Sequence, residues 1–448
     1  MDFLENPTPE DIKIEILRGN LKKAENKIKE RLEYKIPPGL SKKLHFELFR
    51  IKTLRKVYSL TERQAYELLK KNLRGLTKKE FERLTQENIL DWMWIDGVKL
   101  YESRFDSNLF FNYQEFKSRR KMTENLRLSK KRKSIIDRSI SKIIRSGKAS
   151  KYEIKAKISL KRKEPSSEKV RVWLPFPKEG FQQYDVKLIS ASHEFFISPN
   201  AVEQKTIYME GKDTEEFYVE FSYKIYEWIG TKRLCTDLPS NQDLSEKPPH
   251  IRFTPYLYNL LDIIFHGEDL KNMEDTTKAR RIYDFITLNV NYSYVLPYIM
   301  YDNIPEYVAT VFKGDCGFQA LLFITLCRMV GIPAKWQSGW SITPINASPH
   351  DWALVYLEKY GWVPVDLSFG GGRRENEDFR LFYFTNLDSF RMFANTDFQC
   401  DFNPKNVSWR QDPYDNQVGE MEIITKQEDG YVLDTESTIN VLKFQKIG

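Results

Sequence analysis

The sequence predicts an α+β multidomain protein with an N-terminal helical domain (1–146), a β-sandwich domain (147–232) and a C-terminal domain of mixed helices and strands (233–448). A length of 448 residues exceeds one ordinary hydrophobic core and favours two to four domains. Apolar residues recur at helical spacing in the first third of the chain, and a strict apolar–polar alternation follows. A content of 41% apolar and 14% aromatic residues excludes a disordered chain.

The helical domain is predicted from its helix-start signals. Thr61 with Gln64, and Thr77 with Glu80, have the spacing of the capping box that opens a helix. Residues 37–39, Pro-Pro-Gly, break the pattern between two helices. No pairing of a nucleophile with a base occurs here, so we expect this domain to serve packing or partner binding.

A basic segment, residues 117–148, ends the helical domain. It contains thirteen Lys or Arg and two acidic residues, an excess of +11 in a chain of net charge +7, so the remainder is net negative. Ile136, Ile140, Ile143 and Ile144 share one helical face, which favours a connecting helix docked by an apolar stripe. The alternative is an electrostatic surface for an acidic partner. We do not expect nucleic acid to bind, because no aromatic residues are interleaved with the basic ones.

Residues 147–232 are predicted to form an antiparallel β-sandwich. Residues 152–160 and 217–225 alternate strictly between apolar and polar, as strands with one buried face do. Residues 170–174 and 186–189 supply further strands. At the far end of the chain, residues 418–425 and 438–443 are strand-like and are expected to complete a sheet.

The chemistry that the sequence indicates begins at Cys316. An apolar-rich helical pattern follows it from Gly317 to Val330, and Gly331 with Pro333 marks the end of that helix. The dipole of a helix N-terminus lowers a thiol's pKa, and the free N–H groups there stabilise an oxyanion. Asp315 is expected to cap the helix. The alternative is an inert, buried cysteine, but the flanking glycines permit close substrate approach.

His350 is the predicted general base, chosen from five histidines. The others are His45, His193, His250 and His266; the first two fall in the helical and β-rich regions, and the last two are weak rivals. His350 stands between a polar loop and a strand-like run, residues 352–356. That position places it on a strand edge that faces a loop-lined cleft.

Asp366 is predicted to orient His350. The turn at 359–361 predicts a hairpin of 352–357 with 362–366, whose antiparallel register brings Asp366 beside His350. A surface aspartate is the alternative. Asp351 is the less favoured orienter, because adjacent strand residues face opposite ways. The three glycines at 370–372 are expected to form a solvent loop or a lid, and the aromatic-rich residues 379–412 to cover the core.

Two runs in this region, GDCGFQALLFITLCRMVGIPA (314–334) and HDWALVYLEKYGWVPVD (350–366), together resemble the transglutaminase-like superfamily over about residues 275–370. The resemblance implies a papain-like core in which Cys316, His350 and Asp366 form a catalytic triad. It also implies a cytosolic bacterial type with extra N-terminal domains. The family often completes its oxyanion hole with an upstream aromatic or Gln side chain, and Tyr292 and Tyr294 both lie in that neighbourhood.

We therefore expect thiol-dependent acyl transfer on protein or peptide amides through a thioester. Hydrolysis is favoured over cross-linking, because water is always available and cross-linking needs a dry, amine-selective cleft. The alternatives are a cross-linking protein-glutamine gamma-glutamyltransferase, or a binding scaffold with a vestigial triad. We expect no metal or cofactor; calcium in particular needs a cluster of acidic ligands that the sequence does not show.

Cysteine usage and hydropathy predict a cytoplasmic location. The four cysteines, Cys235, Cys316, Cys327 and Cys400, show no close pairing, which is typical of free thiols in a reducing compartment. The first residues show no basic region followed by an apolar run, so we expect no signal peptide. No stretch approaches the roughly 18–20 apolar residues that a membrane span needs.

Overall fold

The computed structural model describes residues 6–230, 237–410, 415–424 and 432–448. They form two compact units: unit 1 holds the described residues of Met1–Leu128 with Asn291–Asp302, and unit 2 holds those of Ser129–Val290 with Asn303–Gly448. The protein mixes helices with several sheets, as predicted. The boundaries between the three predicted domains stay predictions.

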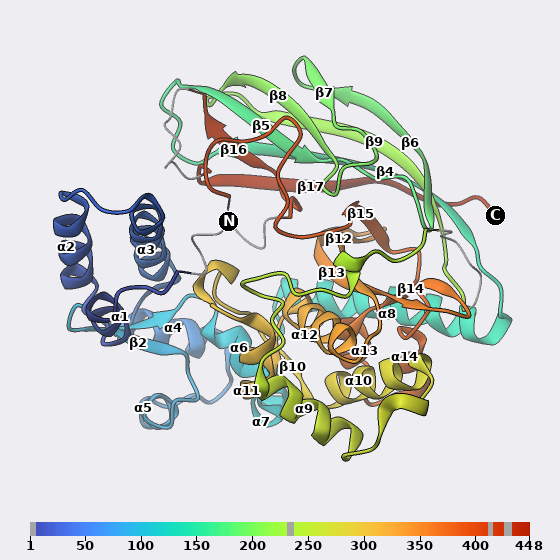
Figure 1. The fold of residues 1–448 in the computed structure, drawn as a ribbon, viewed down its shortest axis with the longest axis horizontal. Coiled ribbons are helices and arrows are strands. Elements are labelled where there is room, and N and C mark those ends of the chain that lie inside the picture. Colours follow the sequence, from blue (N-terminus) through green and yellow to red (C-terminus); the bar gives the residue numbers. More distant parts are fainter. Residues whose placement is uncertain (1–5, 231–236, 411–414, 425–431) are drawn as a thin grey trace. The chain divides into compact units, whose positions relative to one another are not determined.

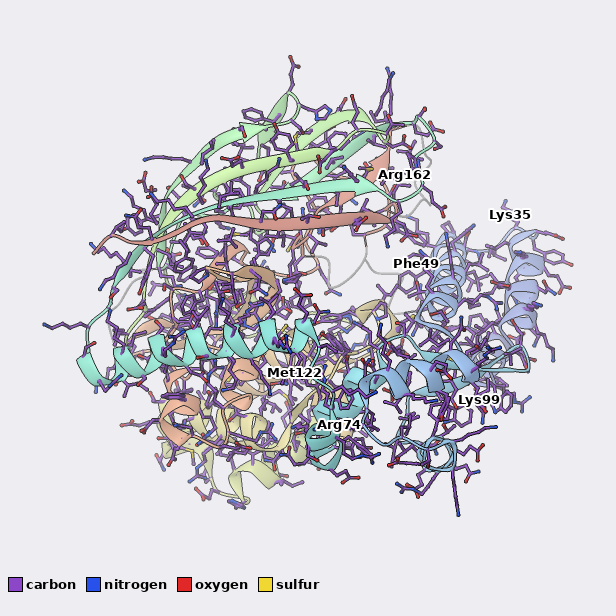
Figure 2. The ribbon with its side chains drawn as sticks, turned by 180° about the vertical axis from the view of Figure 1, so that it is seen from behind. Lys35, Phe49, Arg74, Lys99, Met122 and Arg162 are labelled. Carbon is purple, nitrogen blue, oxygen red and sulfur yellow. The ribbon has the colours of Figure 1, made fainter. Side chains whose placement is uncertain are left out.

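Unit 1 is built on helices, but it also contains a small sheet that the sequence analysis did not predict. Strands β1 (Tyr58–Thr61), β3 (Val98–Glu102) and β2 (Trp92–Ile95) form an antiparallel sheet in that order. Asp96 and Gly97 connect β2 to β3 with φ of 49° and 83°. An Asp-Gly turn flanked by apolar residues is a hairpin signal that the helical interpretation overlooked. Lys99, which is labelled in Figure 2, follows this turn. Its ammonium group lies over the rings of Trp92 and Trp94.

Two helices of unit 1 begin where the sequence places their caps. Thr61 and Gln64 form the predicted capping box, and Thr77 accepts a hydrogen bond from the Glu80 N–H. The helices of unit 1 are α1 (Glu10–Leu17), α2 (Leu21–Leu32), α3 (Pro38–Val57), α4 (Glu62–Asn72), α5 (Lys78–Gln86), α6 (Phe105–Asn112) and α7 (Gln114–Arg119). They enclose two apolar clusters.

Unit 1 also contains residues 291–302, which the sequence analysis placed in the C-terminal domain. This segment carries β10 (Asn291–Tyr292) and a 3-10 turn at Tyr298–Met300. The Asn108 side chain accepts a hydrogen bond from the Tyr294 N–H at 2.8 Å and donates to the Tyr294 carbonyl at 3.1 Å. Arg104 donates to the Val295 carbonyl at 2.7 Å. Three backbone groups of this segment are thus satisfied by side chains of helix α6 and the residue before it.

Unit 2 contains the predicted β-sandwich, made of two four-stranded antiparallel sheets (Figure 1). One sheet has the order β17 (Thr435–Lys446), β4 (Lys151–Arg162), β9 (Phe217–Tyr226) and β6 (Gln183–Ala191). The other has the order β16 (Glu420–Ile423), β5 (Lys169–Pro175), β8 (Thr206–Lys212) and β7 (Phe195–Ile197). The C-terminal strands β16 and β17 therefore complete the sandwich, one in each sheet, as predicted. Arg162, labelled in Figure 2, ends β4. It pairs with the buried Asp213.

A third sheet in unit 2 carries the candidate site. Its order is β14 (Gly361–Val365), β13 (Asn346–Leu357), β12 (Ala334–Thr343) and β15 (Arg391–Asn395), all antiparallel. The predicted hairpin is confirmed, with Leu357 opposite Gly361 and Ala353 opposite Val365. Trp340 of β12 stacks on Phe221 of β9, so this sheet and the sandwich share one apolar core.

In Figure 1, helices of unit 2 lie below this sheet and the sandwich lies above it. These helices are α9 (Pro255–Phe265), α10 (Asp275–Asn289), α11 (Ile304–Val311), α12 (Cys316–Met329), α13 (Leu367–Gly371) and α14 (Glu377–Phe382), with 3-10 turns at Asn241–Asp243 and Leu270–Asn272 and a short strand β11 (Lys313–Gly314). Helix α12 packs on β13 and β12 and is buried along nearly its whole length, as its apolar sequence requires.

The basic segment forms the long helix α8 (Glu124–Ser146), seen just after Met122 in Figure 2. Ile136, Ile140 and Ile143 are buried, so the predicted apolar stripe is confirmed, but Ile144 is exposed. Arg132 donates to the Ser348 hydroxyl and the Ser341 carbonyl, both at 2.8 Å. One of the basic side chains thus anchors α8 to the end of the β12–β13 hairpin.

Candidate active site

Cys316 is the first residue of α12. Asp315 caps the helix, as predicted, because its carboxylate accepts a hydrogen bond from the Phe318 N–H at 3.0 Å. Cys316 is partly exposed, whereas residues 317–328 that follow it in the helix are buried. The predicted helix and its end at Gly331, which has φ of 82°, are confirmed. Cys316 therefore lies at a partly exposed end of a helix whose residues 317–328 are inside the core.

The Cys316 thiol hydrogen-bonds to Asp351. The distance from Sγ to Oδ2 is 3.1 Å. Burial raises the pKa of Cys316 well above its ordinary value, and the Asp351 and Asp315 carboxylates raise it further. The helix N-terminus was expected to lower this pKa, and that expectation was wrong, because burial and the carboxylates of Asp351 and Asp315 act in the opposite direction. The Cys316 thiol is therefore protonated at rest.

His350 lies on β13 next to Asp351 and hydrogen-bonds to Asp366. The distance from Nε2 to Oδ2 is 2.7 Å, and both side chains are buried. The ring also packs on Phe369, with 4.5 Å between ring centroids. Burial lowers the pKa of His350, although Asp366 opposes this. The imidazole is therefore neutral near pH 7 and can accept a proton.

Asp366 is held from three directions. Oδ2 accepts hydrogen bonds from His350 and from Arg391 Nη2, each at 2.7 Å, and Oδ1 accepts the Phe369 N–H at 3.0 Å. Burial by itself would raise the pKa of Asp366, but His350 and Arg391 lower it to about 2. Arg391, which is 1% exposed at its side chain, also pairs with the buried Asp388 at 3.0 Å. The carboxylate that orients His350 is thus ionised and fixed in place.

The glycine-rich residues after Asp366 form neither a solvent loop nor a lid, so both expectations were wrong. Asp366 caps the short helix α13, in which Gly370 and Gly371 are buried. A Cβ built on Gly370 would lie 2.1 Å from the Tyr283 hydroxyl oxygen of α10. Glycine is required here because two helices approach each other closely.

The structure brings His350 and Asp366 into direct contact and places Cys316 against the neighbouring strand residue, Asp351. Among the described residues, no hydrogen bond joins Cys316 to His350. No sequence signal pointed to Arg391. Asp351, the less favoured orienter of His350, contacts the Cys316 thiol instead. Adjacent strand residues do have different partners, as expected, but the position of α12 was needed to show what Asp351 meets.

The predicted oxyanion-hole tyrosines have packing partners in unit 1. The Tyr292 and Tyr294 rings lie against Phe111, with centroid distances of 5.2 and 5.6 Å. Arg104 lies over the Tyr294 ring at 4.7 Å. A role for either tyrosine in stabilising an oxyanion stays a prediction.

Residues 267–367, which include Cys316, His350 and Asp366, match the family model of the transglutaminase-like superfamily. This chain carries a transglutaminase-like domain. The predicted resemblance is confirmed over that range. No curated protein matches the chain.

Two solved structures resemble parts of the chain that extend beyond the transglutaminase-like domain. One is a protein from Cytophaga hutchinsonii described as a candidate cysteine protease, with 16% identity, a TM-score of 0.42, and coverage of 66% of this chain and 92% of that one. The other is the periplasmic domain of TgpA from Pseudomonas aeruginosa, with 12% identity, a TM-score of 0.28, and coverage of 54% and 94%. Similarity at this level does not bear on the reaction.

The structure also bears on the predictions about the cysteines and about membrane spans. Cys316, Cys327 and Cys400 are free, as predicted, and Cys235 lies outside the described residues. Within the described ranges, no helix combines the length and apolar character that crossing a membrane requires. The cytoplasmic location stays a prediction.

Proposed function

We propose that the transglutaminase-like domain catalyses thiol-dependent acyl transfer from protein or peptide amides, with Cys316 as nucleophile, His350 as general base and Asp366 as its orienter. The observation that carries the proposal is the 2.7 Å hydrogen bond between His350 and Asp366. His350 lies on β13, and the next residue of that strand, Asp351, contacts the Cys316 thiol. A nucleophile, a base and a group that fixes the base are the parts this chemistry needs.

The hydrogen bonds around His350 support its role as the base. Nε2 donates to Asp366, which fixes the tautomer and leaves Nδ1 without a hydrogen bond among the described residues. Nδ1 is then the nitrogen that takes the proton of the Cys316 thiol. The positive charge that forms on the imidazole is stabilised by the ionised Asp366 carboxylate, which keeps its charge because Arg391 holds it.

The reaction proceeds in two halves. His350 Nδ1 takes the Sγ proton, the thiolate attacks the amide carbonyl carbon, and the C–N bond breaks as His350 returns the proton to the leaving amine. A thioester on Cys316 remains. Water, deprotonated by His350, then attacks the thioester carbonyl, and the proton returns to sulfur as the acid leaves. The free N–H groups at the start of α12 stabilise the oxyanion in both halves.

We infer that water is the usual acceptor, so the domain is a peptidase or deamidase rather than a cross-linking enzyme. Cross-linking needs an amine to exclude water from the thioester, which requires a closed cleft. The segment after Asp366, which the sequence offered as a lid, is a packed helix instead.

The test is to trap the thioester. Full-length protein is mixed with a library of peptides that contain Gln and ordinary peptide bonds, with and without a labelled primary amine, and products are identified by mass spectrometry. Wild type should give cleaved or deamidated peptide and an acyl adduct on Cys316; Cys316→Ala and His350→Ala should give neither. Cys400→Ala is the control, because it removes another partly exposed thiol of the same unit. If the products contain the labelled amine in place of the carboxylic acid that hydrolysis would give, the reaction is cross-linking. A wild type that forms no adduct with any peptide would support the scaffold alternative.

A further inference from the structure

Besides Asp366, which contacts His350, the site contains the carboxyl group of Asp351, which contacts the sulfur of Cys316. Its Oδ2 accepts the hydrogen bond from Cys316 Sγ at 3.1 Å, and its Oδ1 is hydrogen-bonded by the Gln417 amide. The side chain is buried, with the residue 6% exposed. Both oxygens of Asp351 are thus occupied by groups that do not belong to the His350–Asp366 pair.

Gln417 connects Asp351 to another buried acid, Asp415. The same Nε2 that bonds Asp351 lies 3.1 Å from Asp415 Oδ2, which also accepts from Trp336 Nε1 at 3.3 Å and from the Ser338 hydroxyl. Asp415 Oδ1 is buried and has no hydrogen-bond partner in the described part of the chain. Burial raises the pKa of Asp415 to about 6, as expected for a carboxyl group with one oxygen left bare.

The segment that carries Gln417 is fixed to the two neighbouring sheets. The Trp340 indole donates to the Gln417 carbonyl at 2.6 Å, and the Asn416 side chain donates to the Trp173 carbonyl at 2.9 Å. Asn395 donates to the Asn416 carbonyl at 3.1 Å. A residue anchored through its backbone in this way presents its side chain to Asp351 in one orientation, so the contact is part of the site's architecture.

We propose that Asp351 is the resting-state partner of the Cys316 thiol: its carboxylate holds the S–H group and keeps the proton on sulfur until His350 removes it. The inference rests on the proposed thiol chemistry. The carboxylate favours the thiol twice, because it accepts the S–H hydrogen bond and because it repels the negative charge of a thiolate. Asp351 is therefore a positioning residue that competes with His350 for the thiol.

The charges around Asp351 agree with this role. Asp315 caps α12 beside Cys316 and raises the pKa of its thiol. Burial, Asp415 and Asp315 raise the pKa of Asp351 itself well above its ordinary value, and the Asp351 carboxylate in turn raises the pKa of the Cys316 thiol. His350, the adjacent strand residue, is neutral near pH 7. Arg410 lowers the pKa of Asp415, and its guanidinium is hydrogen-bonded to Glu420 and Gln204. No described cation contacts the sulfur, so a thiolate forms only when the proton has an acceptor.

The test measures the pH profile of Cys316 alkylation in the full chain, with iodoacetamide as probe and peptide mass spectrometry to resolve each cysteine. In wild type, the pH at which the alkylation rate of Cys316 reaches half its maximum (the midpoint) should lie above the midpoint of free cysteine. Asp351→Asn should move the midpoint down by at least one pH unit, because a neutral amide does not oppose the thiolate. The proton should then go to His350, so the low-pH reactivity of Asp351→Asn should disappear in the double variant with His350→Ala.

Two controls separate charge from structure. Asp351→Glu keeps the carboxylate and should leave the midpoint within half a pH unit of wild type. Glu358→Gln removes one negative charge from the exposed turn of the same hairpin and should leave the midpoint unchanged. A variant that merely loosens the site would raise the plateau rate without moving the midpoint. If Asp351→Asn does not fold, Asp351→Ser removes the charge with a smaller side chain.

The outcomes distinguish this inference from the proposed function. A midpoint that stays within half a unit in Asp351→Asn, or moves upward, overturns the role of Asp351 whatever the enzyme's substrate. If the midpoint falls as expected but no peptide acylates Cys316, the thiol–carboxylate contact stands and the proposed acyl transfer fails.

Discussion

Arg391 Nη2 and His350 Nε2 bond to the same carboxylate oxygen, Oδ2 of Asp366, each at 2.7 Å. One guanidinium therefore neutralises the carboxylate that orients the candidate base. Arg391 also reaches Asp388, whose Oδ2 accepts the Tyr383 hydroxyl at 2.6 Å, so a buried network of charges lies directly behind His350. Orientation of the base depends on this network as much as on Asp366.

We predict that Arg391→Met destabilises the protein by about 3–5 kcal/mol, because it leaves two buried carboxylates without their shared cation. Chemical denaturation of both proteins at pH 7.5 measures this difference. Arg373→Met is the matched control, since Arg373 pairs with the partly exposed Asp137 and its loss should cost much less. Equal losses in the two variants would contradict a special role for the Arg391 network.

Asp366→Asn should lower kcat/KM on the order of 10³-fold, because the amide no longer fixes the His350 tautomer or stabilises imidazolium. The measurement is turnover of whichever peptide the trapping experiment identifies. Circular dichroism and a thermal melt on the same sample show whether the variant folds. Full activity in a folded Asp366→Asn protein would remove Asp366 from the mechanism.

His350 should make the protein less stable as the pH falls below about 6.5. Its pKa is lowered in the folded state, so between that lowered value and the ordinary one the unfolded chain binds more protons. The stabilisation is therefore present at pH 7.5 and decreases with acidification. The unfolding free energy of wild type should drop more between pH 7.5 and 5.5 than that of His350→Gln. Parallel pH dependences for the two proteins would be inconsistent with a buried neutral histidine.

Gly370→Ala should disturb the site from a distance. The new methyl group would meet the Tyr283 hydroxyl at 2.1 Å, and α13 would have to move away from α10 while its cap, Asp366, is bonded to His350. We expect a loss of about 1–3 kcal/mol and reduced activity. Gly371→Ala, in the same helix, meets nothing closer than 3.4 Å and should cost less than half of that. Thermal unfolding and peptide turnover are measured for both variants. A larger loss in Gly371→Ala than in Gly370→Ala would contradict the role of the close contact with Tyr283.

Several features follow from short stretches of sequence. The capping signals of Thr61 and Asp315, the stop at Gly331 and the hairpin that joins β13 to β14 all agree with their predictions. Each of these features depends on residues that are close in the sequence, so its backbone conformation is specified without contacts from distant segments. The Asp96–Gly97 hairpin belongs to the same class and was readable, although the helical surroundings hid it.

The sequence by itself determined the candidates: a cysteine at the start of a buried helix, a histidine on the next hairpin and an aspartate at its end. Only the tertiary structure decided their electrostatics. Arg391 is 25 residues from Asp366 and Gln417 is 66 residues from Asp351, yet their side chains touch. A pKa depends on burial and on the nearest charges, and both are set by segments that meet only in the folded chain. For that reason the helix position of Cys316 was predictable, and the raised pKa of its thiol was not.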